Sequence, residues 1–265
     1  MAYLSVNTYS DALKRSVNFK LLLPNDLSAE FRENNPHYAR PPKFLILLHG
    51  YSGSSQDWLL ESDIAALAGK YNLAVALPSG QNSFYLDLPG TGRKYGCFIG
   101  EELPDYIRRT FGLEAAGEGA FVGGLSMGGF GALHVGLSYP ERFSKIAAFS
   151  AALIIHQAAG MRPGFENDIA DYDYYRFIFG DPEKLLQSEK NPEVLIRQLK
   201  EEGRTIPGIY LAIGTEDFLY EDNQQFRRFL SEEAIPFTYQ EGPGGHDFAF
   251  WNRYLDDALR WFLNE

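Results

Sequence analysis

The sequence has very little cysteine, no excess of positive charge and no long hydrophobic segment. Cys97 is the only cysteine, so no disulfide can form within the chain, and we expect a reducing, cytoplasmic location. The formal net charge is −11, from 24 Lys and Arg against 35 Asp and Glu, which argues against nucleic acid or an anionic membrane as a partner. The apolar run at 44–48 is too short to cross a bilayer, and the N-terminal residues lack the apolar segment of a signal peptide. These absences predict a soluble protein with no membrane partner.

Internal repeats and low-complexity tracts are also missing. The residues are 45% hydrophobic and 22% charged, as is usual for globular proteins. A chain of 265 residues can bury a sizeable core, and we expect a single domain over residues 1–265. The composition leaves open whether the protein forms a homo-oligomer.

Short apolar runs alternate with helical patterns along most of the chain. Two strands, at 2–9 and 16–23, are expected to form an antiparallel edge. From residue 43 onward, apolar runs predict buried strands at 43–49, 73–78, 120–126, 145–151, 209–214 and 237–242. The segments between them predict helices at 63–71, 100–112, 127–139 and 248–263. This alternation is typical of an α/β protein with a mostly parallel central sheet flanked by helices.

Two segments interrupt the alternation. Residues 25–42 are polar and contain three prolines, so we expect a surface loop in which His37 is solvated. Residues 152–206 contain aromatic and charged helical stretches but no clear strand. We predict a helical, cap-like insertion at about 152–206, over the strand ends where α/β proteins bind ligands. The alternative is a set of ordinary connecting helices.

Five glycines surround Ser126 in the sequence GGLSMGGFGA, residues 123–132. Gly124-Leu125-Ser126-Met127-Gly128 matches G-x-S-x-G, and it lies between a predicted strand and a predicted helix, as a nucleophile elbow requires. Such a tight turn needs small residues at both flanking positions and holds the serine in a strained conformation. A phosphate-binding loop is the alternative, but the sequence lacks its G-x-x-x-x-G-K-[ST] pattern. Ser126 is therefore the predicted nucleophile.

A serine nucleophile needs a base and an acid that orients the base. In proteins with a nucleophile elbow of this kind, the acid follows the serine along the chain and the histidine comes last. His246 lies in a glycine-rich loop after the final predicted strand and is the predicted base, whereas the other histidines have structural or surface positions. The loop after the strand at 209–214 supplies Asp217 as the predicted acid, with Glu216 as the second choice.

Backbone N–H groups and bulky side chains complete the predicted site. The oxyanion hole is expected from the N–H groups of Tyr51, in the loop after the first buried strand, and of Met127, which follows the nucleophile. Large side chains near these elements predict a short substrate pocket, lined by Trp58, Phe218, Leu219 and Trp251. No metal or cofactor is expected, and Cys97 is expected to be dispensable.

Several segments resemble a known enzyme family. LLHGYSGSSQDWL, GLSMGGFGALHVGLSYPERF, GTEDFLYEDN and GGHDFAFW are similar to the esterase D-type α/β-hydrolases, in particular the bacterial tributyrin esterase (acetyl esterase) branch. The resemblance covers nearly the whole chain and implies an α/β-hydrolase fold. It also implies a serine carboxylesterase that forms an acyl-enzyme with short acyl groups, acetyl to hexanoyl, and sometimes deacetylates sugars. On the matching motifs, Ser126, Asp217 and His246 would form the catalytic triad, with Tyr51 and Met127 as oxyanion donors.

Related activities stay open as alternatives. S-formylglutathione hydrolases typically carry a cysteine in the oxyanion loop and a histidine before the elbow serine, where this chain has Ser54 with its neighbours and Leu125. Feruloyl-type esterases, and acyltransferases that use the same acyl-enzyme, fit the motifs as well. A non-catalytic ligand-binding member of the fold is expected to lack a triad residue, and none is missing here.

Overall fold

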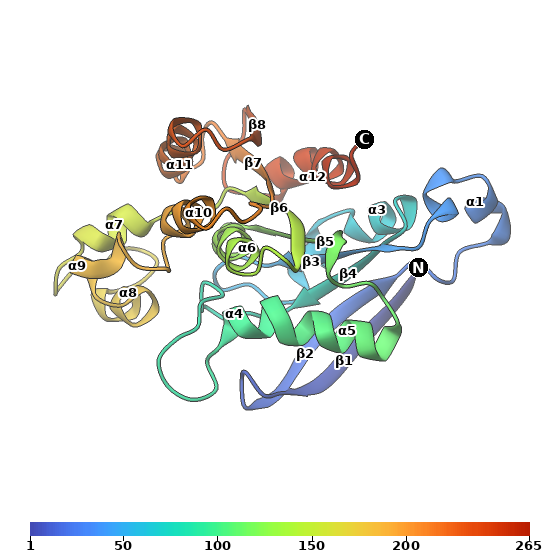
Figure 1. The fold of residues 1–265 in the computed structure, drawn as a ribbon, viewed down its shortest axis with the longest axis horizontal. Helices are drawn as coiled ribbons and strands as arrows, with labels where there is room; N and C mark the ends of the chain where they lie inside the picture. Colours follow the sequence, from blue (N-terminus) through green and yellow to red (C-terminus); the bar gives the residue numbers. More distant parts are fainter.

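An eight-stranded sheet forms the centre of the protein, in the order β1-β2-β4-β3-β5-β6-β7-β8 (Figure 1). The computed structural model describes residues 1–265. Neighbouring strands from β4 to β8 in this order are parallel, whereas β1 pairs with β2 and β2 with β4 in antiparallel fashion. The strands are β1 Ala2–Ser10, β2 Arg15–Leu23, β3 Lys43–Leu48, β4 Leu73–Pro78, β5 Gly117–Leu125, β6 Phe143–Phe149, β7 Gly208–Gly214 and β8 Phe237–Gly242. The predicted α/β architecture, with its antiparallel edge, is confirmed.

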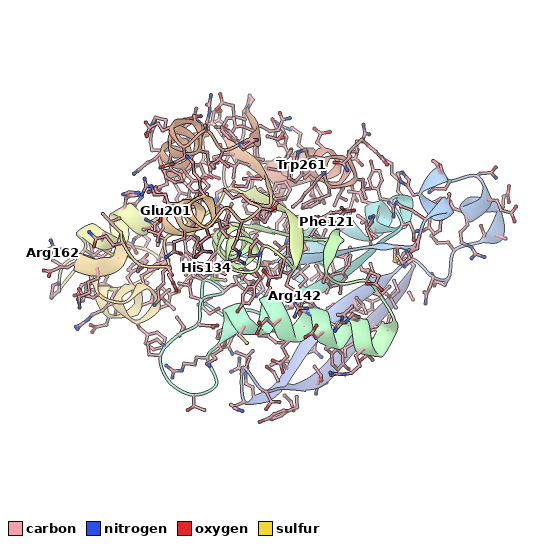
Figure 2. The ribbon with its side chains drawn as sticks, viewed as in Figure 1. Phe121, His134, Arg142, Arg162, Glu201 and Trp261 are labelled. Atoms are coloured by element: carbon pink, nitrogen blue, oxygen red, sulfur yellow. The ribbon has the colours of Figure 1, made fainter.

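Helices cover both faces of this sheet (Figure 1). They are α1 Ala29–Glu33, η1 Pro36–Ala39, α2 Asp57–Glu61, α3 Ile64–Lys70, α4 Tyr95–Cys97, η2 Phe98–Glu102, α5 Leu103–Phe111, α6 Met127–Ser138, α7 Ile155–Gly160, α8 Tyr172–Phe179, α9 Pro182–Leu185, α10 Pro192–Glu201, α11 Tyr220–Glu232 and α12 Phe248–Leu263. One apolar core lies between the sheet and α5, α6, α10 and α11, and a second lies on the other face beneath α2, α3 and α12. Phe121 of β5 belongs to this second core, and Figure 2 labels it together with Trp261 of α12.

The strands are buried on both faces because their sequences are continuously apolar. All six residues of β4 are buried, as are the last five of β3. On α12, by contrast, buried residues recur at helical spacing, so only one side of the helix is apolar. Burial on both sides of the sheet fixes the register of the central strands, and with it the positions of the loops at their carboxyl ends.

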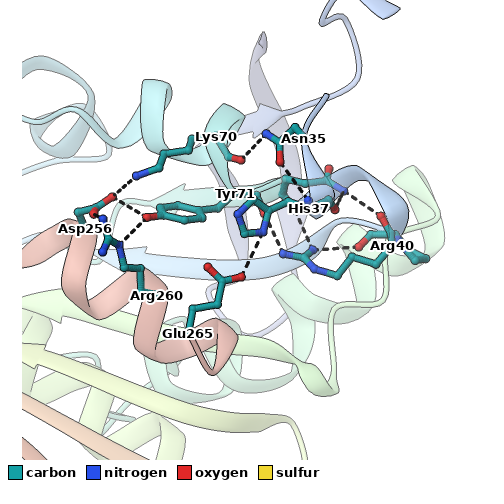
Figure 3. Close-up of polar contacts among 10 residues, drawn as sticks. Asn35, His37, Arg40, Lys70, Tyr71, Asp256, Arg260 and Glu265 are labelled. Atoms are coloured by element: carbon teal, nitrogen blue, oxygen red, sulfur yellow. Dashed lines mark hydrogen bonds and ion pairs between the residues drawn. The ribbon is translucent and has the colours of Figure 1, made fainter. Parts of the chain in front are cut away.

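Residues 25–42 differ from the predicted loop. Ser28 and Asn35 cap the two short helices α1 and η1. His37 is not solvated: its side chain is 15% exposed, its ring packs edge-on against Tyr71, and its Nδ1 lies 3.3 Å from a Glu265 carboxylate oxygen (Figure 3). The polar composition suggested a loop, but local capping and contacts with the end of the chain order the segment.

Polar contacts around Tyr71 join the end of α3 to α12. The Tyr71 hydroxyl donates to Asp256 Oδ1 at 2.8 Å and accepts from Arg260 Nε at 3.0 Å (Figure 3). Lys70 Nζ lies 3.0 Å from the same Asp256 oxygen. The N-terminal third of the chain is therefore tied to its last helix on the side of the sheet away from α6.

Residues 152–206 form α7 to α10 and no strand. The helices α7, α8 and α9 make a lobe beside the sheet, at the left in Figure 1. The helix α10 packs against α6, with Ile196 and Leu199 in the main core. The lobe thus spans the earlier part of the segment, whereas α10 is a connecting helix of the sheet. No helix combines the length and the hydropathy that a membrane-spanning helix needs.

Candidate active site

Ser126 occupies a tight turn between β5 and α6. Its backbone has φ 55° and ψ −121°, a strained conformation for a residue other than glycine. Its N–H donates to the Phe149 carbonyl at 2.8 Å, and its carbonyl accepts from the N–H groups of Phe130 at 3.0 Å and Ala152 at 2.9 Å. These three bonds hold the strained residue at the N-terminus of α6.

Two glycines make this turn sterically feasible. A Cβ atom on Gly124 would lie 2.4 Å from the Gly128 carbonyl oxygen, and one on Gly128 would lie 2.5 Å from the Leu48 carbonyl oxygen. Neither backbone oxygen can move without disrupting β3 or α6. The pattern G-x-S-x-G at 124–128 is therefore required by packing at both flanking positions.

Asp217 and His246 meet at the carboxyl end of the sheet. Asp217 follows β7 and His246 follows β8, and the His246 Nδ1 lies 2.9 Å from Asp217 Oδ2 and 3.1 Å from Oδ1. The Asp217 side chain is fully buried, and its Oδ1 also accepts from the Leu219 N–H at 2.9 Å. Burial raises the pKa of Asp217, but hydrogen bonds and charge from His246, with the Leu219 N–H and the Ser150 hydroxyl, outweigh it and hold this pKa below its usual value.

Sequence reasoning missed Ser150. This residue follows β6, is fully buried and has a left-handed backbone with φ 45°. Its hydroxyl helps to hold the pKa of the Asp217 carboxyl down and accepts from the Trp251 Nε1–H at 2.9 Å. The Trp251 ring also packs edge-on against His246, with ring centroids 5.1 Å apart. Trp251 and Ser150 therefore lie behind the Asp217–His246 pair, and no local sequence motif signals this arrangement.

Glu216, the second-choice acid, points elsewhere. Its Oε2 accepts a hydrogen bond of 2.6 Å from the Gly244 N–H, two residues before His246. The carboxylate that contacts the imidazole thus belongs to Asp217, and Glu216 braces the loop that carries His246.

The remaining histidines are engaged in other contacts. His49 is buried, with Nδ1 2.7 Å from the Gly50 carbonyl and Nε2 accepting from the Gly80 N–H, so a neutral ring satisfies both partners. His134 lies on α6 (Figure 2), where its Nε2 is 3.0 Å from the Glu189 carbonyl and burial lowers its pKa to about 4. His156 pairs with Glu193 at 2.9 Å. Only His246 contacts the carboxylate at the strand ends.

The loop after β3 lies against the elbow. A Cβ on Gly50 would be 3.4 Å from the Ser126 Cβ, so this backbone passes directly beside the serine. The N–H groups of Tyr51 and Met127 donate to no protein acceptor. Two free backbone donors thus flank Ser126, the arrangement that can stabilise a negatively charged oxygen.

A hollow of about 190 Å³ opens at Ser126, and ten of its thirteen lining residues are hydrophobic. Two of the predicted pocket residues, Phe218 and Leu219, line it together with Tyr51, Ser126 and Met127. The opposite wall comes from the segment predicted as a cap, 152–206, and consists of Ile154, Gln157, Met161, Asn167, Ile169 and Tyr175. No group of three or more His, Cys, Asp or Glu side chains forms a candidate metal site.

Two of the predicted pocket residues lie elsewhere. Trp58 is 1% exposed in the core beneath α12, where it packs against Phe149 and donates from Nε1 to the Leu48 carbonyl at 3.0 Å. Trp251 lies behind His246 and is 5% exposed. Both expectations are corrected: each tryptophan follows a site loop in sequence, but its helix turns the ring toward the second core.

A mostly parallel sheet with a strand–serine–helix turn, and with an acid and a histidine after the last two strands, defines an α/β-hydrolase. The solved structures agree. FphF, a fluorophosphonate-binding serine hydrolase of Staphylococcus aureus, superposes with a TM-score of 0.84 at 28% identity, covering 100% of this chain and 99% of that one. An S-formylglutathione hydrolase (FrmB) of the same organism gives a TM-score of 0.82 at 28% identity, with 99% of each chain covered.

The chain belongs to the Esterase family, which residues 10–262 match. It is 42% identical over 261 residues to an acetyl esterase of Caldicellulosiruptor saccharolyticus, covering 98% of each chain. The protein is a carboxylic ester hydrolase of the α/β-hydrolase fold.

Proposed function

We propose that the protein hydrolyses short-chain acyl esters, acetyl to hexanoyl, through an acyl-enzyme on Ser126. The observation that carries the proposal is the position of Ser126, strained at a helix N-terminus and opening into an apolar hollow of about 190 Å³. Pockets for drug-sized ligands measure roughly 300–1,000 Å³, so this hollow suits a small acyl group. The 42% identity to an acetyl esterase supports the same substrate class, including acetylated sugars.

The first half of the reaction forms the acyl-enzyme. His246 Nε2 takes the Ser126 hydroxyl proton as Oγ attacks the ester carbonyl carbon, and the carbonyl oxygen becomes negatively charged. The free N–H groups of Tyr51 and Met127 are placed to bind that oxygen. Asp217 holds His246 through Nδ1, which leaves Nε2 as the proton acceptor and stabilises the imidazolium. The C–O bond to the alcohol then breaks, and His246 returns its proton to the leaving oxygen.

The second half hydrolyses the acyl-enzyme. His246 takes a proton from water, whose oxygen attacks the acyl carbon, and the bond to Ser126 Oγ breaks as the serine recovers its proton. The residues of the 152–206 segment that line the hollow support its role as a cap over this site. The single cysteine supports a cytoplasmic location for the enzyme.

Acyl length tests the pocket. Each methylene that the apolar hollow buries contributes about 0.8 kcal/mol, so kcat/KM should improve over the first few carbons of a p-nitrophenyl ester series. Beyond the wall formed by Met161 and Ile169, further carbons must stay in water or displace the cap, so kcat/KM should fall. A value still rising at decanoate or laurate would mean an open acyl channel and a lipase-like enzyme.

Ser126→Ala tests the chemistry. Removal of a triad nucleophile costs about 10⁶-fold in kcat in comparable enzymes. Ser138→Ala, at the far end of the same helix, is the matched control and should keep full activity. Near wild-type hydrolysis by a folded Ser126→Ala variant would end the proposal. Adding S-formylglutathione, methyl ferulate and an acceptor alcohol to the panel separates the alternative activities.

A further inference from the structure

A second, larger hollow lies next to the candidate active site. Its volume is about 780 Å³, and it is bounded by the β1–β2 turn, the loops at 81–83 and 91–95, and α8. It shares no lining residue with the hollow at Ser126. The mechanism proposed above uses none of its side chains.

The charge of this hollow is opposite to that of the protein. Three of its fourteen lining residues, Lys14, Arg15 and Arg93, are cationic and none is acidic. The whole chain has 35 acidic residues against 24 Lys and Arg, so a lining without a single carboxylate is a marked local departure. Lys14 has one ion pair, with the exposed Asp11 at 3.3 Å.

Contacts with aromatic residues position the two arginines and leave guanidinium N–H groups without an acceptor. Neither forms an ion pair with any Asp or Glu. Arg15 donates from Nη2 to the Tyr95 hydroxyl at 2.8 Å, and Arg93 stacks over the Phe177 ring at 4.8 Å and makes no side-chain hydrogen bond. Aromatic stacking fixes a guanidinium plane while leaving its N–H groups available, which is the arrangement that binds carboxylate or phosphate oxygens.

One layer of side chains separates this hollow from the site. Tyr174, which lines it, packs edge-on against Tyr51 of the Ser126 hollow, with ring centroids 5.7 Å apart. Asn82 also lines it, and its Oδ1 accepts from the Ser52 N–H at 2.8 Å, while its carbonyl accepts from the Tyr174 hydroxyl at 2.8 Å. The loop that carries the Tyr51 N–H is therefore anchored to the wall of the cationic hollow.

We infer that this hollow binds an oxyanion group, carboxylate or phosphate, carried by the alcohol or thiol part of the ester. The acyl group enters the small apolar hollow, so the leaving part must extend away from it, and Arg15 and Arg93 bind the anion on that part. This inference rests on the proposed function, because it assigns the other half of the same substrate.

Matched esters test the inference by turnover. The substrates are acetyl esters of a straight-chain ω-hydroxy acid, of the corresponding ω-hydroxy amide and of the corresponding ω-hydroxyalkyl phosphate, each in several chain lengths. At low salt, one or both anionic esters should have a kcat/KM about ten-fold or more above that of the neutral amide. We expect this ratio at the chain length that spans the two hollows, because one charge-assisted hydrogen bond supplies a difference of that size. Which anion is preferred distinguishes a carboxylate from a phosphate substrate.

Charge-removing variants locate the effect. Arg15→Gln combined with Arg93→Gln should abolish the preference while kcat/KM for the amide stays unchanged. Arg109→Gln is the control, because Arg109 also lies exposed over a ring, that of Tyr106, and forms no ion pair, but it is on α5 outside the hollow. Equal rates for charged and neutral esters, or an equal loss of preference in Arg109→Gln, would overturn the inference.

Binding of an anion to the cationic hollow can also be measured without turnover. Adipate and inorganic phosphate are titrated into the Ser126→Ala protein at constant ionic strength, and the melting temperature is followed. A saturable rise that disappears with Arg15→Gln and Arg93→Gln supports the site, and no saturable rise with either anion refutes it. Failure of all ester hydrolysis with intact anion binding would instead contradict the proposed function.

Discussion

Glu216 accepts a 2.6 Å hydrogen bond from the Gly244 N–H, while its neighbour Asp217 contacts His246. Two consecutive carboxylates therefore hold the same loop at two points. The first fixes the backbone before the histidine, and the second fixes the ring.

Amide substitution should separate these two roles. Asp217→Asn removes the charge beside His246 and favours the wrong imidazole tautomer, so kcat should fall by about 10⁴-fold, as in comparable triads. Glu216→Gln keeps an oxygen that can accept from Gly244 and should change kcat by less than about ten-fold. Steady-state kinetics on a p-nitrophenyl acetate assay compares them. A larger loss in Glu216→Gln would show that the acid is misassigned.

Ser150→Ala should impair turnover although Ser150 does not touch the substrate pocket. The change removes a hydroxyl that stabilises the ionised Asp217 carboxylate and leaves the buried Trp251 Nε1–H without its acceptor, which costs roughly 1–3 kcal/mol. We expect kcat to fall by about ten-fold with KM unchanged, because Ser150 positions the acid and does not bind the ester. Trp251→Phe keeps the Ser150 hydroxyl and should have a smaller effect on kcat. Unchanged kcat in a folded Ser150→Ala protein would limit Ser150 to a packing role.

Cys97 should be dispensable for activity. Burial, together with a hydrogen bond to Glu101 and nearby carboxylates, raises the pKa of the Cys97 thiol to about 11. At neutral pH only on the order of one thiol in ten thousand is then ionised, and the thiolate is the reactive form. Cys97→Ser should keep wild-type kcat, and iodoacetamide should inhibit the wild type slowly or not at all. Rapid inhibition that Cys97→Ser abolishes would reveal a thiol-dependent enzyme.

Asp256 should stabilise the protein only above acidic pH. Partial burial raises its pKa, but hydrogen bonds from Tyr71 and Lys70 and the charges of Lys70 and Arg260 lower it below the usual value. A carboxyl group with a lower pKa in the folded state stabilises that state above its unfolded pKa of about 3.9, and the effect is lost as pH falls through the folded value.

The difference in unfolding free energy between wild type and Asp256→Asn measures this contribution. We expect about 0.5–1 kcal/mol at pH 7, shrinking toward pH 3, by urea unfolding. Other carboxyl groups titrate in both proteins and cancel in the difference. Asp257→Asn, exposed and without an ion pair, is the control and should show no pH-dependent difference. An Asp256→Asn difference that is constant down to pH 3 would contradict the assignment.

The sheet and the meeting of Asp217 with His246 could be predicted because local signals suffice for them. Strands such as β4 are apolar throughout, and the carboxyl ends of parallel strands meet at one edge, so residues after β7 and β8 come together. The glycines at 124 and 128 mark the elbow because backbone oxygens exclude a Cβ at each.

Other features depend on contacts that no local pattern encodes. Trp58 was expected in the pocket from its nearness in sequence to Tyr51, but the rotation of α2 points its ring into the core. The pocket wall at Met161 and Ile169 comes from an irregular segment. Its side chains do not follow the periodicity of a helix or a strand, so the sequence pattern does not show which of them face the pocket. Ser150 joins Trp251, which lies 101 residues away, and only the folded sheet brings the two together.

The segment from Ser150 to Ala152 has a mechanical consequence. Within three residues it places the Ser150 hydroxyl where it stabilises the Asp217 carboxylate, and the Ala152 N–H donates to the Ser126 carbonyl, while Asn223 of α11 donates to the Ala151 carbonyl at 2.8 Å. The spacing of Ser126 and Asp217 is thus set by one buried tripeptide that extends a central strand, not by two independent surface loops. Heat should then leave this spacing intact until the sheet itself melts, so that loss of activity and loss of the fold occur over the same temperature range.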